Sequence, residues 1–186
     1  QDPATAKKNQ SVYGFWWSSI IGQMVSAYRI QKHVLKVKKA SFFSISNELL
    51  VFVLVQGAYL IGVYLVLGAG GLFYAAGFAL VSVLLLETIN YIEHYGLVRE
   101  RKGERYERVT PAHSWNSNHV IGRMVLYELT RHSDHHHRAS KKYQVLESIE
   151  ESPQLPFGYT TSMVLSLLPP VWFSLMNRRL PESISA

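Results

Sequence analysis

Histidine is concentrated in one part of this sequence. Seven of the eight histidines lie between His94 and His137, and four of them fall in the string RHSDHHH at 131–137. On a helix, His135 and His136 follow His132 by about 300° and 400°, so these three imidazoles share one face and His137 points away. Three convergent imidazoles can hold a metal ion. A hydrophilic loop that is merely rich in histidine is the alternative interpretation.

A second group of polar residues follows a long apolar segment. Glu87, Asn90 and His94 are spaced i, i+3, i+7, which aligns them on one stripe of a helix. Ionisable groups at the end of a membrane helix are costly unless they face a partner or a cavity, so they are functional candidates. We expect His94 to meet the other histidine-bearing element there, with Glu87 and Asn90 in support. Interfacial side chains that reach toward water are the alternative.

Other polar side chains are candidates for holding the imidazoles in place. Metal-bound imidazoles usually donate their second N–H group to a carboxylate or a similar acceptor, and Glu93 and Asp134 are predicted to serve in this way. Either acid could instead be a solvated charge. His113 and His119 are six residues apart, which suits no helical face, so we expect them to support the site rather than to bind a metal.

The apolar segment predicts a membrane hairpin. Residues 49–86 contain no Asp, Glu, Lys or Arg, a run much longer than the roughly 20 residues that a membrane helix needs. The glycine cluster at 68–71 divides it into 49–67 and 72 to about 95. Nineteen residues at about 1.5 Å each span about 28 Å, enough to cross a bilayer. Basic residues flank both outer ends, so the open ends of this hairpin, 49–95, should face the cytoplasm.

The rest of the chain predicts an all-α membrane bundle with a cytoplasmic histidine-rich region. Tryptophans followed by basic residues indicate an amphipathic helix at the membrane interface, although packing on a soluble domain is an alternative. The expected segments are a linker at 1–10, this helix at 11–39, the cytoplasmic region at 96–160 and a short membrane-associated helix at 161–176, interrupted by Pro169 and Pro170. Within 96–160 we expect a loop or short hairpin at 103–118, a helix from Val120 to about Arg138 and a loop at 152–158.

Composition excludes several classes of function. The absence of cysteine removes disulfides, iron–sulfur clusters and thiolate ligands, so any metal must be bound by nitrogen and oxygen. The net charge is +6, but seven of the 19 basic residues precede the apolar run and no basic patch is interleaved with aromatics, so nucleic acid is not an expected partner. The sequence has no G-x-S-x-G, G-x-G-x-x-G, P-loop or H-E-x-x-H motif, which leaves hydrolase, dinucleotide, kinase and zinc-peptidase functions unsupported.

Several strings together resemble a known family. NYIEHYGL at 90–97, HSWNSNH at 113–119, RHSDHH at 131–136, and PQLP at 153–156 with Gly158 and Tyr159 are similar in order and spacing to the C-terminal half of the integral-membrane alkane 1-monooxygenases, which are non-haem diiron enzymes. The resemblance extends over nearly the whole chain.

The resemblance implies a helical bundle in the bacterial inner membrane, with two iron ions on its cytoplasmic side and a hydrophobic channel through the bilayer. It implies hydroxylation of medium-chain n-alkanes to 1-alkanols with O₂ and electrons from a rubredoxin-type donor. By the same resemblance, the iron ligands in this chain are His94, His132, His135 and His136. Spacing alone would also allow zinc or manganese.

One departure from the family pattern is large. The family's earlier histidine motifs, HExxHK and EHxxGHH, are absent, so we expect the chain to be a C-terminal part of a longer enzyme that is inactive alone. Two alternatives remain open. One is a related diiron oxygenase, either an aryl-methyl hydroxylase or a fatty-acyl desaturase, and the other is a non-catalytic metal-binding membrane protein.

Overall fold

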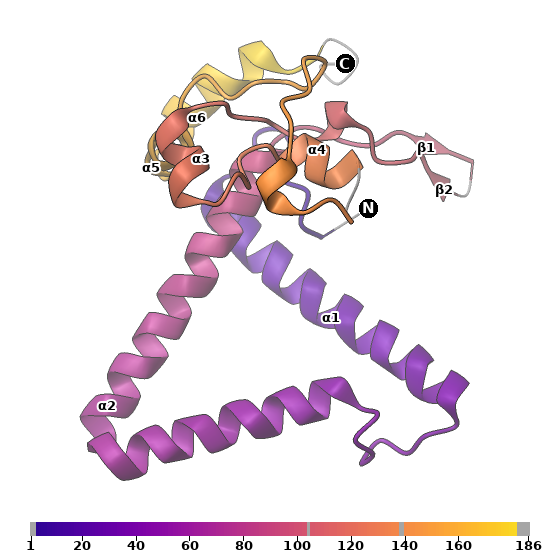
Figure 1. The fold of residues 1–186 in the computed structure, drawn as a ribbon, viewed down its shortest axis with the longest axis vertical. Helices are drawn as coiled ribbons and strands as arrows, with labels where there is room; N and C mark the ends of the chain where they lie inside the picture. The colour runs from indigo at the N-terminus through magenta and orange to yellow at the C-terminus, as the bar shows by residue number, and fades with distance from the viewer. Residues whose placement is uncertain (1–2, 104, 138–139, 182–186) are drawn as a thin grey trace. The chain divides into compact units, whose positions relative to one another are not determined.

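The computed structural model of the chain describes residues 3–103, 105–137 and 140–181, and its regular secondary structure is almost entirely helical (Figure 1). In these residues the strands are limited to a two-residue antiparallel pair, with Arg101 opposite Tyr106, so the predicted all-α class is confirmed. The elements are α1 (Val12–Lys38), α2 (Glu48–His94), β1 (Arg101–Lys102), β2 (Arg105–Tyr106), η1 (Pro111–His113), α3 (Val120–Val125), α4 (His132–His137), η2 (Tyr143–Val145), α5 (Tyr159–Ser166), α6 (Pro169–Met176) and η3 (Asn177–Arg179).

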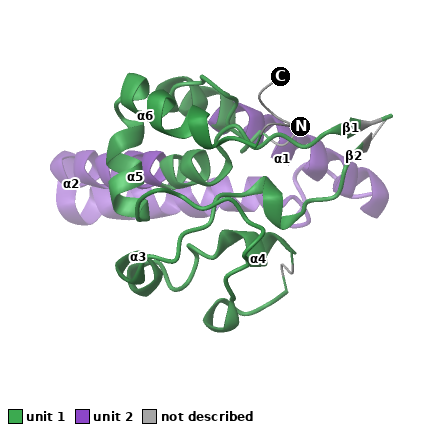
Figure 2. Ribbon diagram, turned by 90° about the horizontal axis from the view of Figure 1, so that it is seen from above, with its two compact units in different colours: residues 1–19, 86–186 green, residues 20–85 purple. Residues whose placement is uncertain are grey.

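The chain divides into two compact units (Figure 2). Unit 1 comprises Gln1–Ser19 and Leu86–Ala186, and unit 2 comprises Ile20–Leu85. Both long helices contribute to both units, because α1 passes from unit 1 to unit 2 and α2 returns from unit 2 to unit 1. All the histidines from His94 onward therefore belong to unit 1.

Helix α2 is interrupted in unit 2 at Gly68. Its backbone there has φ 68° and ψ −167°, a conformation that is essentially restricted to glycine. The break falls on the first residue of the predicted glycine cluster. By length and composition α2 is able to cross a membrane, with a mean hydropathy of 2.3 over its most apolar stretch, and no residue from 49 to 86 is buried. Passage of its two arms through a bilayer remains a prediction.

Aromatic side chains form the core of unit 1 around the last turns of α2. Tyr91 and Tyr95 pack against Trp172 of α6 with ring centroids 5.8 and 5.7 Å apart, and Trp115 donates a hydrogen bond to the Tyr95 carbonyl. Residues 3–10, predicted as a linker, form no helix or strand. They nevertheless contribute the fully buried Ala6 to this core, which the linker prediction did not anticipate.

A glycine ends α2 in unit 1. Gly96 has φ 71°, and its N–H group donates to the carbonyl of Ala6 at 2.9 Å. A Cβ atom at this position would lie 2.5 Å from Cδ2 of Leu180. The left-handed conformation and the close contact together explain why a glycine terminates this helix directly after His94.

The helix predicted from Val120 to about Arg138 is wrong as a single element. Helix α3 ends at Val125, and α4 begins only at His132. Between them Tyr127 and Glu128 both have positive φ, 51° and 61°, so the backbone leaves the right-handed helical region. Farther along, the interruption expected at Pro169 is present, because α5 ends at Ser166 and α6 starts at Pro169.

Candidate metal centre

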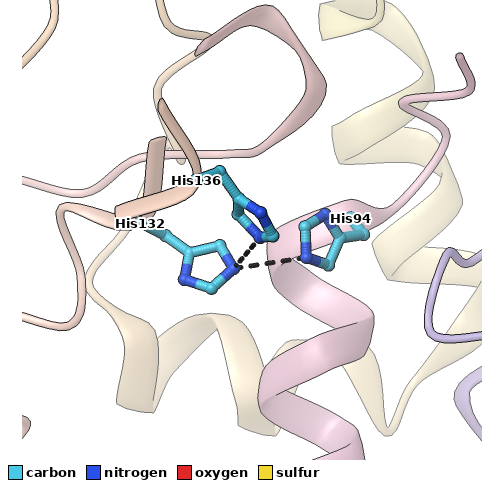
Figure 3. A group of neighbouring side chains, drawn as sticks. All are labelled: His94, His132 and His136. Atoms are coloured by element: carbon cyan, nitrogen blue, oxygen red, sulfur yellow. Dashed lines mark hydrogen bonds between the residues drawn. The ribbon is translucent and has the colours of Figure 1, made fainter. Parts of the chain in front are cut away.

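Three imidazoles from two elements meet in unit 1. His94 is the last residue of α2, and His132 and His136 lie one turn apart on α4 (Figure 3). The Nε2 atom of His132 lies 3.2 Å from Nε2 of His94 and 2.8 Å from Nε2 of His136. Ligand atoms of all three residues lie within 4.8 Å of one another, although the chain positions are up to 42 residues apart.

These distances fit a shared metal ion. Metal–nitrogen bonds of about 2.1 Å place two cis ligands about 3.0 Å apart at right angles and about 3.4 Å apart in a tetrahedron. The separations of 3.2 and 2.8 Å lie near this range. A neutral imidazole has only one N–H donor. When three imidazole nitrogens point to one place without a cation, some of their lone pairs therefore face one another. The donor set therefore fits a cation better than a hydrogen-bonded cluster.

The ring of His94 is held by the backbone. Its Nδ1 atom lies 3.2 Å from the carbonyl oxygen of His113, which can only accept a hydrogen bond. This contact favours the proton on Nδ1 and makes Nε2 the nitrogen that can bind a metal. His113 thus contacts His94 through its carbonyl group, and a supporting role for this residue in a metal site remains a prediction. Its own ring is engaged by Glu107, with Nε2 3.0 Å from Oε1, and by the N–H group of Thr110.

A buried carboxylate borders the three imidazoles. Glu93 is 1% exposed, and its Oε2 atom lies 3.3 Å from Nε2 of His132. Its other oxygen, Oε1, accepts a hydrogen bond from the hydroxyl of Tyr159 at 2.9 Å. The carboxylate is therefore oriented from one side by α5 and presents its second oxygen to the place where the imidazoles converge. Ionisation of a buried carboxyl group of this kind is favoured by a neighbouring cation and is costly without one.

Asp134 fixes the position of α4. It is buried, and its Oδ2 atom accepts hydrogen bonds from Nζ of Lys141 and from the N–H group of Glu147, each at 2.7 Å. These contacts tie the middle of α4 to the segment that follows it. The carboxylate also holds the pKa of Lys141 above its usual value through the hydrogen bond that it accepts. Asp134 thus supports the element that carries two of the imidazoles.

A turn stabilised by arginine leads into α4. The guanidinium of Arg123 donates two hydrogen bonds to the carboxylate of Glu128, at 2.7 and 2.8 Å. Arg131, the residue before His132, lies 3.4 Å from the same carboxylate and also donates to the carbonyl of Leu146. Such fork-shaped arginine contacts fix direction as well as distance. They hold the left-handed turn at 127–128 and so determine where α4 begins.

The site keeps His132 neutral in the absence of a metal. Burial lowers the pKa of His132 well below 6.5, and the neighbouring imidazoles of His94, His136 and His135 lower it further. A neutral imidazole is the form that binds a metal ion. His132 is therefore ready to bind at neutral pH without first losing a proton.

The other predicted residues lie outside this trio. His135 is on the same helix, and its ring centroid lies 5.9 Å from those of His132 and His136, whereas His137 is exposed. His119 is exposed directly before α3, with its ring next to Gly158. Glu87 is buried and Asn90 is partly buried on the same helix as His94. A role for these four candidates, His135, His119, Glu87 and Asn90, remains a prediction.

Sequence reasoning missed three residues of this site. Tyr159, Lys141 and Glu107 each contact a side chain that the spacing had singled out, namely Glu93, Asp134 and His113. Tyr159 occurs in one of the strings that carry the family resemblance, which was the available signal. Lys141 and Glu107 lie in segments without a periodic pattern, so the sequence carried no signal for them.

Comparison with known proteins identifies relatives of this chain. The family model for fatty acid desaturases matches residues 1–165. The chain is 38% identical over 183 residues to an alkane 1-monooxygenase of Acinetobacter baylyi. This alignment covers 98% of this chain and 45% of that protein. It is 42% identical to alkane 1-monooxygenase 2 of Alcanivorax borkumensis over 96% of this chain. It is 44% identical to alkane 1-monooxygenase 1 of Pseudomonas aeruginosa over 95% of this chain. Each alignment covers 47% of the relative.

The chain thus spans about half the length of the curated relatives that it matches. The matched region contains α2, α4 and all three imidazoles of the trio. Because the family model covers most of the 186 residues, the chain belongs to the fatty acid desaturase family.

Proposed function

We propose that this protein serves in the terminal hydroxylation of medium-chain n-alkanes, as an alkane 1-monooxygenase or the C-terminal part of one. In this reaction R–CH₃, O₂, two electrons and two protons give R–CH₂OH and H₂O. The observation that carries the proposal is the convergence of three imidazole nitrogens from two separate motifs within 4.8 Å. The names of the relatives, alkane 1-monooxygenase in each case, support the choice of substrate.

We infer that the metal is iron and that two ions are bound in the complete site. Neutral imidazoles together with an oxygen ligand suit iron, and iron supplies the activation of O₂ when it is bound. In this chain His94, His132 and His136 would hold one ion, with His135 as a further ligand. Glu93 would offer its Oε2 atom to the same place, since that atom lies 3.3 Å from Nε2 of His132.

Other residues of the chain hold these ligands in position. The carbonyl of His113 fixes the tautomer of His94, and Asp134 anchors the middle of α4 through Lys141 and the backbone of Glu147. Hydrogen-bond partners of metal ligands commonly affect metal affinity and activity about 10- to 100-fold. We propose that Glu87, Asn90 and His119 belong to this supporting group in the complete enzyme.

The substrate and the location follow from the apolar helix. An alkane has no polar group, so it is recognised by apolar contacts, each buried CH₂ contributing about 0.8 kcal/mol. The uncharged surface of α2 ends at the turns that carry Glu87 and His94, which suits delivery of an alkane from the bilayer to the metal. We place the site on the cytoplasmic side of the bacterial inner membrane, and we propose a rubredoxin-type protein as the electron donor.

Two adjacent histidines provide a matched test. His136→Ala in the complete protein should lower 1-octanol formation from octane by about 100-fold or more, because a metal ligand is lost. His137→Ala, which changes an exposed residue of the same helix, should leave the rate unchanged. Octanol formation is measured in membranes together with the bound iron and the amount of inserted protein.

Retained activity and full iron content in the His136→Ala variant would overturn the assignment. The unchanged protein should also form more product from octane than from xylene or an acyl substrate. The reverse preference would replace alkane hydroxylation by one of the related oxygenase reactions.

A further inference from the structure

A groove of about 460 Å³ lies in unit 2, between the second half of α1 and the start of α2. Most of its lining is apolar and comes from both helices and the loop that joins them: Tyr28, Leu35, Phe42, Leu49, Leu50 and Val53. A volume of this size is typical of sites for small ligands. The groove belongs to a part of the molecule that does not contain the histidines of the metal centre.

Buried hydrogen bonds fix the walls of the groove. Gln31 is 8% exposed and donates from Nε2 to the carbonyl of Ser46 at 2.8 Å. Asn47 is 2% exposed, donates from Nδ2 to the carbonyl of Phe42 at 2.9 Å and accepts from the N–H group of Leu50 with Oδ1. These bonds hold the loop at 40–47 against both helices. The groove is therefore a built feature rather than a gap beside a loose loop.

The surroundings of the groove are mainly basic. Residues 20–50 contain one acidic side chain, Glu48, which is exposed between the lining residues Asn47 and Leu49. The same range contains five basic side chains: Arg29, Lys32, Lys36, Lys38 and Lys39. Lys32 lines the groove itself. A positive potential favours an anionic ligand, while the apolar lining disfavours a small hydrated ion. The combination selects a ligand with an apolar chain and a negatively charged end.

Exposed apolar side chains next to the groove indicate a lipid environment. Phe43, Ile45 and Met24 are 84%, 90% and 68% exposed. The uncharged run of α2 begins at Leu49, inside the groove. Large apolar side chains beside a basic helix are typical of a segment at the boundary between headgroups and acyl chains. The groove is thus at the level where a phospholipid can enter it.

We propose that this groove binds an anionic phospholipid, with one acyl chain along Leu35, Leu50 and Val53 and the phosphate at Lys32. Charge complementarity and the apolar lining support this ligand, independently of the reaction at the metal centre. Phosphatidylglycerol is the probe that matches both requirements.

The role of the Lys32 charge is tested by two variants that each remove one positive charge. The complete protein is purified in detergent with phosphatidylglycerol or phosphatidylcholine of identical acyl chains, and the lipid retained is counted by native mass spectrometry. Phosphatidylglycerol should be retained in preference to phosphatidylcholine. Lys32→Gln should weaken its retention about fivefold, which is the effect of one cation near a lipid headgroup. Lys36→Gln, on the same helix but outside the lining, should not.

The apolar part is tested by filling the groove. Leu35→Trp should displace phosphatidylglycerol, whereas Val37→Trp, at a position that is 69% exposed, should leave it bound. If Lys32→Gln and Lys36→Gln lose equal amounts of bound phosphatidylglycerol, the lipid is attracted diffusely to a basic surface, and the proposal is overturned. Equal retention of both lipids would also overturn it. So would unchanged retention of phosphatidylglycerol in Leu35→Trp, because the lipid then binds elsewhere on the protein.

Discussion

The hydroxyl group of Tyr159 donates a hydrogen bond of 2.9 Å to Oε1 of Glu93, although 66 residues separate them in the sequence. Both side chains are buried. The other oxygen of the same carboxylate lies 3.3 Å from Nε2 of His132. Helix α5 is thereby connected to the metal centre through a single side chain of α2.

Tyr159→Phe should weaken metal binding without removing a ligand. The variant leaves Oε1 of Glu93 buried without this donor, which costs about 1–3 kcal/mol of folding stability. Because the carboxylate loses its orientation, we expect metal affinity to fall about 10- to 100-fold. Metal titration and the free energy of unfolding are measured on the same samples. Tyr127→Phe, at a side chain that is 69% exposed, is the control, and an affinity equal to that of the unchanged protein in Tyr159→Phe would contradict the role of the hydrogen bond.

The stability of the metal-free protein should decrease as the pH falls below about 6.5, the pKa of an unfolded histidine. The folded protein lowers the pKa of His132, so it binds fewer protons at this position than the unfolded chain does. The stability that this residue contributes is complete above that pH. It is lost on acidification at up to about 1.4 kcal/mol per pH unit for one group.

The measurement is the unfolding midpoint of metal-free protein across this pH range. His132→Gln should flatten the dependence, whereas His33→Gln, at an exposed position on α1, should not. A pH profile that is the same in His132→Gln and in the unchanged protein would show that another group is responsible.

Gly96→Ala should destabilise unit 1. The new side chain would have to adopt a φ of 71°, which costs about 1–2 kcal/mol, and its Cβ atom would lie 2.5 Å from Leu180. Gly77→Ala is the control, because Gly77 lies within α2 with nothing near its Cβ position. Leu180 is itself buried in the core, so the contact is isolated by a double-mutant cycle. Gly96→Ala should cost less unfolding free energy in a Leu180→Ala background than in the unchanged protein, by the part that comes from the contact. An equal cost in both backgrounds would show that backbone conformation alone accounts for the loss.

Glu128→Gln should make the protein less sensitive to acid. The hydrogen bonds from Arg123 hold the pKa of Glu128 below its usual value, so the contribution of this carboxylate to stability is present above about pH 4.3 and is lost as the pH falls through the folded-state pKa. From about pH 5 to about pH 3 the unfolding midpoint of the unchanged protein should fall more than that of Glu128→Gln. Glu150→Gln, at an exposed position, is the control. Parallel curves for Glu128→Gln and the unchanged protein would contradict the stabilising role of the turn.

Local spacing was sufficient to predict that some of these histidines would lie together. It placed His132, His135 and His136 on one face of a helix, and the cost of a polar stripe at the end of an apolar helix singled out His94. The break in α2 at Gly68 followed from the glycine cluster. Each of these features depends on residues within about two turns of one another, where the sequence alone determines the geometry.

Other features could not be predicted, because they depend on contacts between distant residues. The turn that separates α3 from α4 requires left-handed conformations at Tyr127 and Glu128, residues that rarely adopt them, and it is held by Arg123 and Arg131. The periodicity of the segment instead favoured one continuous helix. The hydrogen bond from Tyr159 to Glu93 joins two helices, and no spacing rule relates them.

The contact between His94 and His113 has a further consequence. Because the acceptor is a main-chain oxygen, replacing His113 by another amino acid does not remove that atom. A substitution can only shift it, through loss of the contacts of the His113 ring with Glu107 and Thr110. Inserting or deleting one residue within 110–115 is the direct way to displace it. The orientation of this ring is encoded in the course of the polypeptide, so relatives can preserve it while the side chain at position 113 varies.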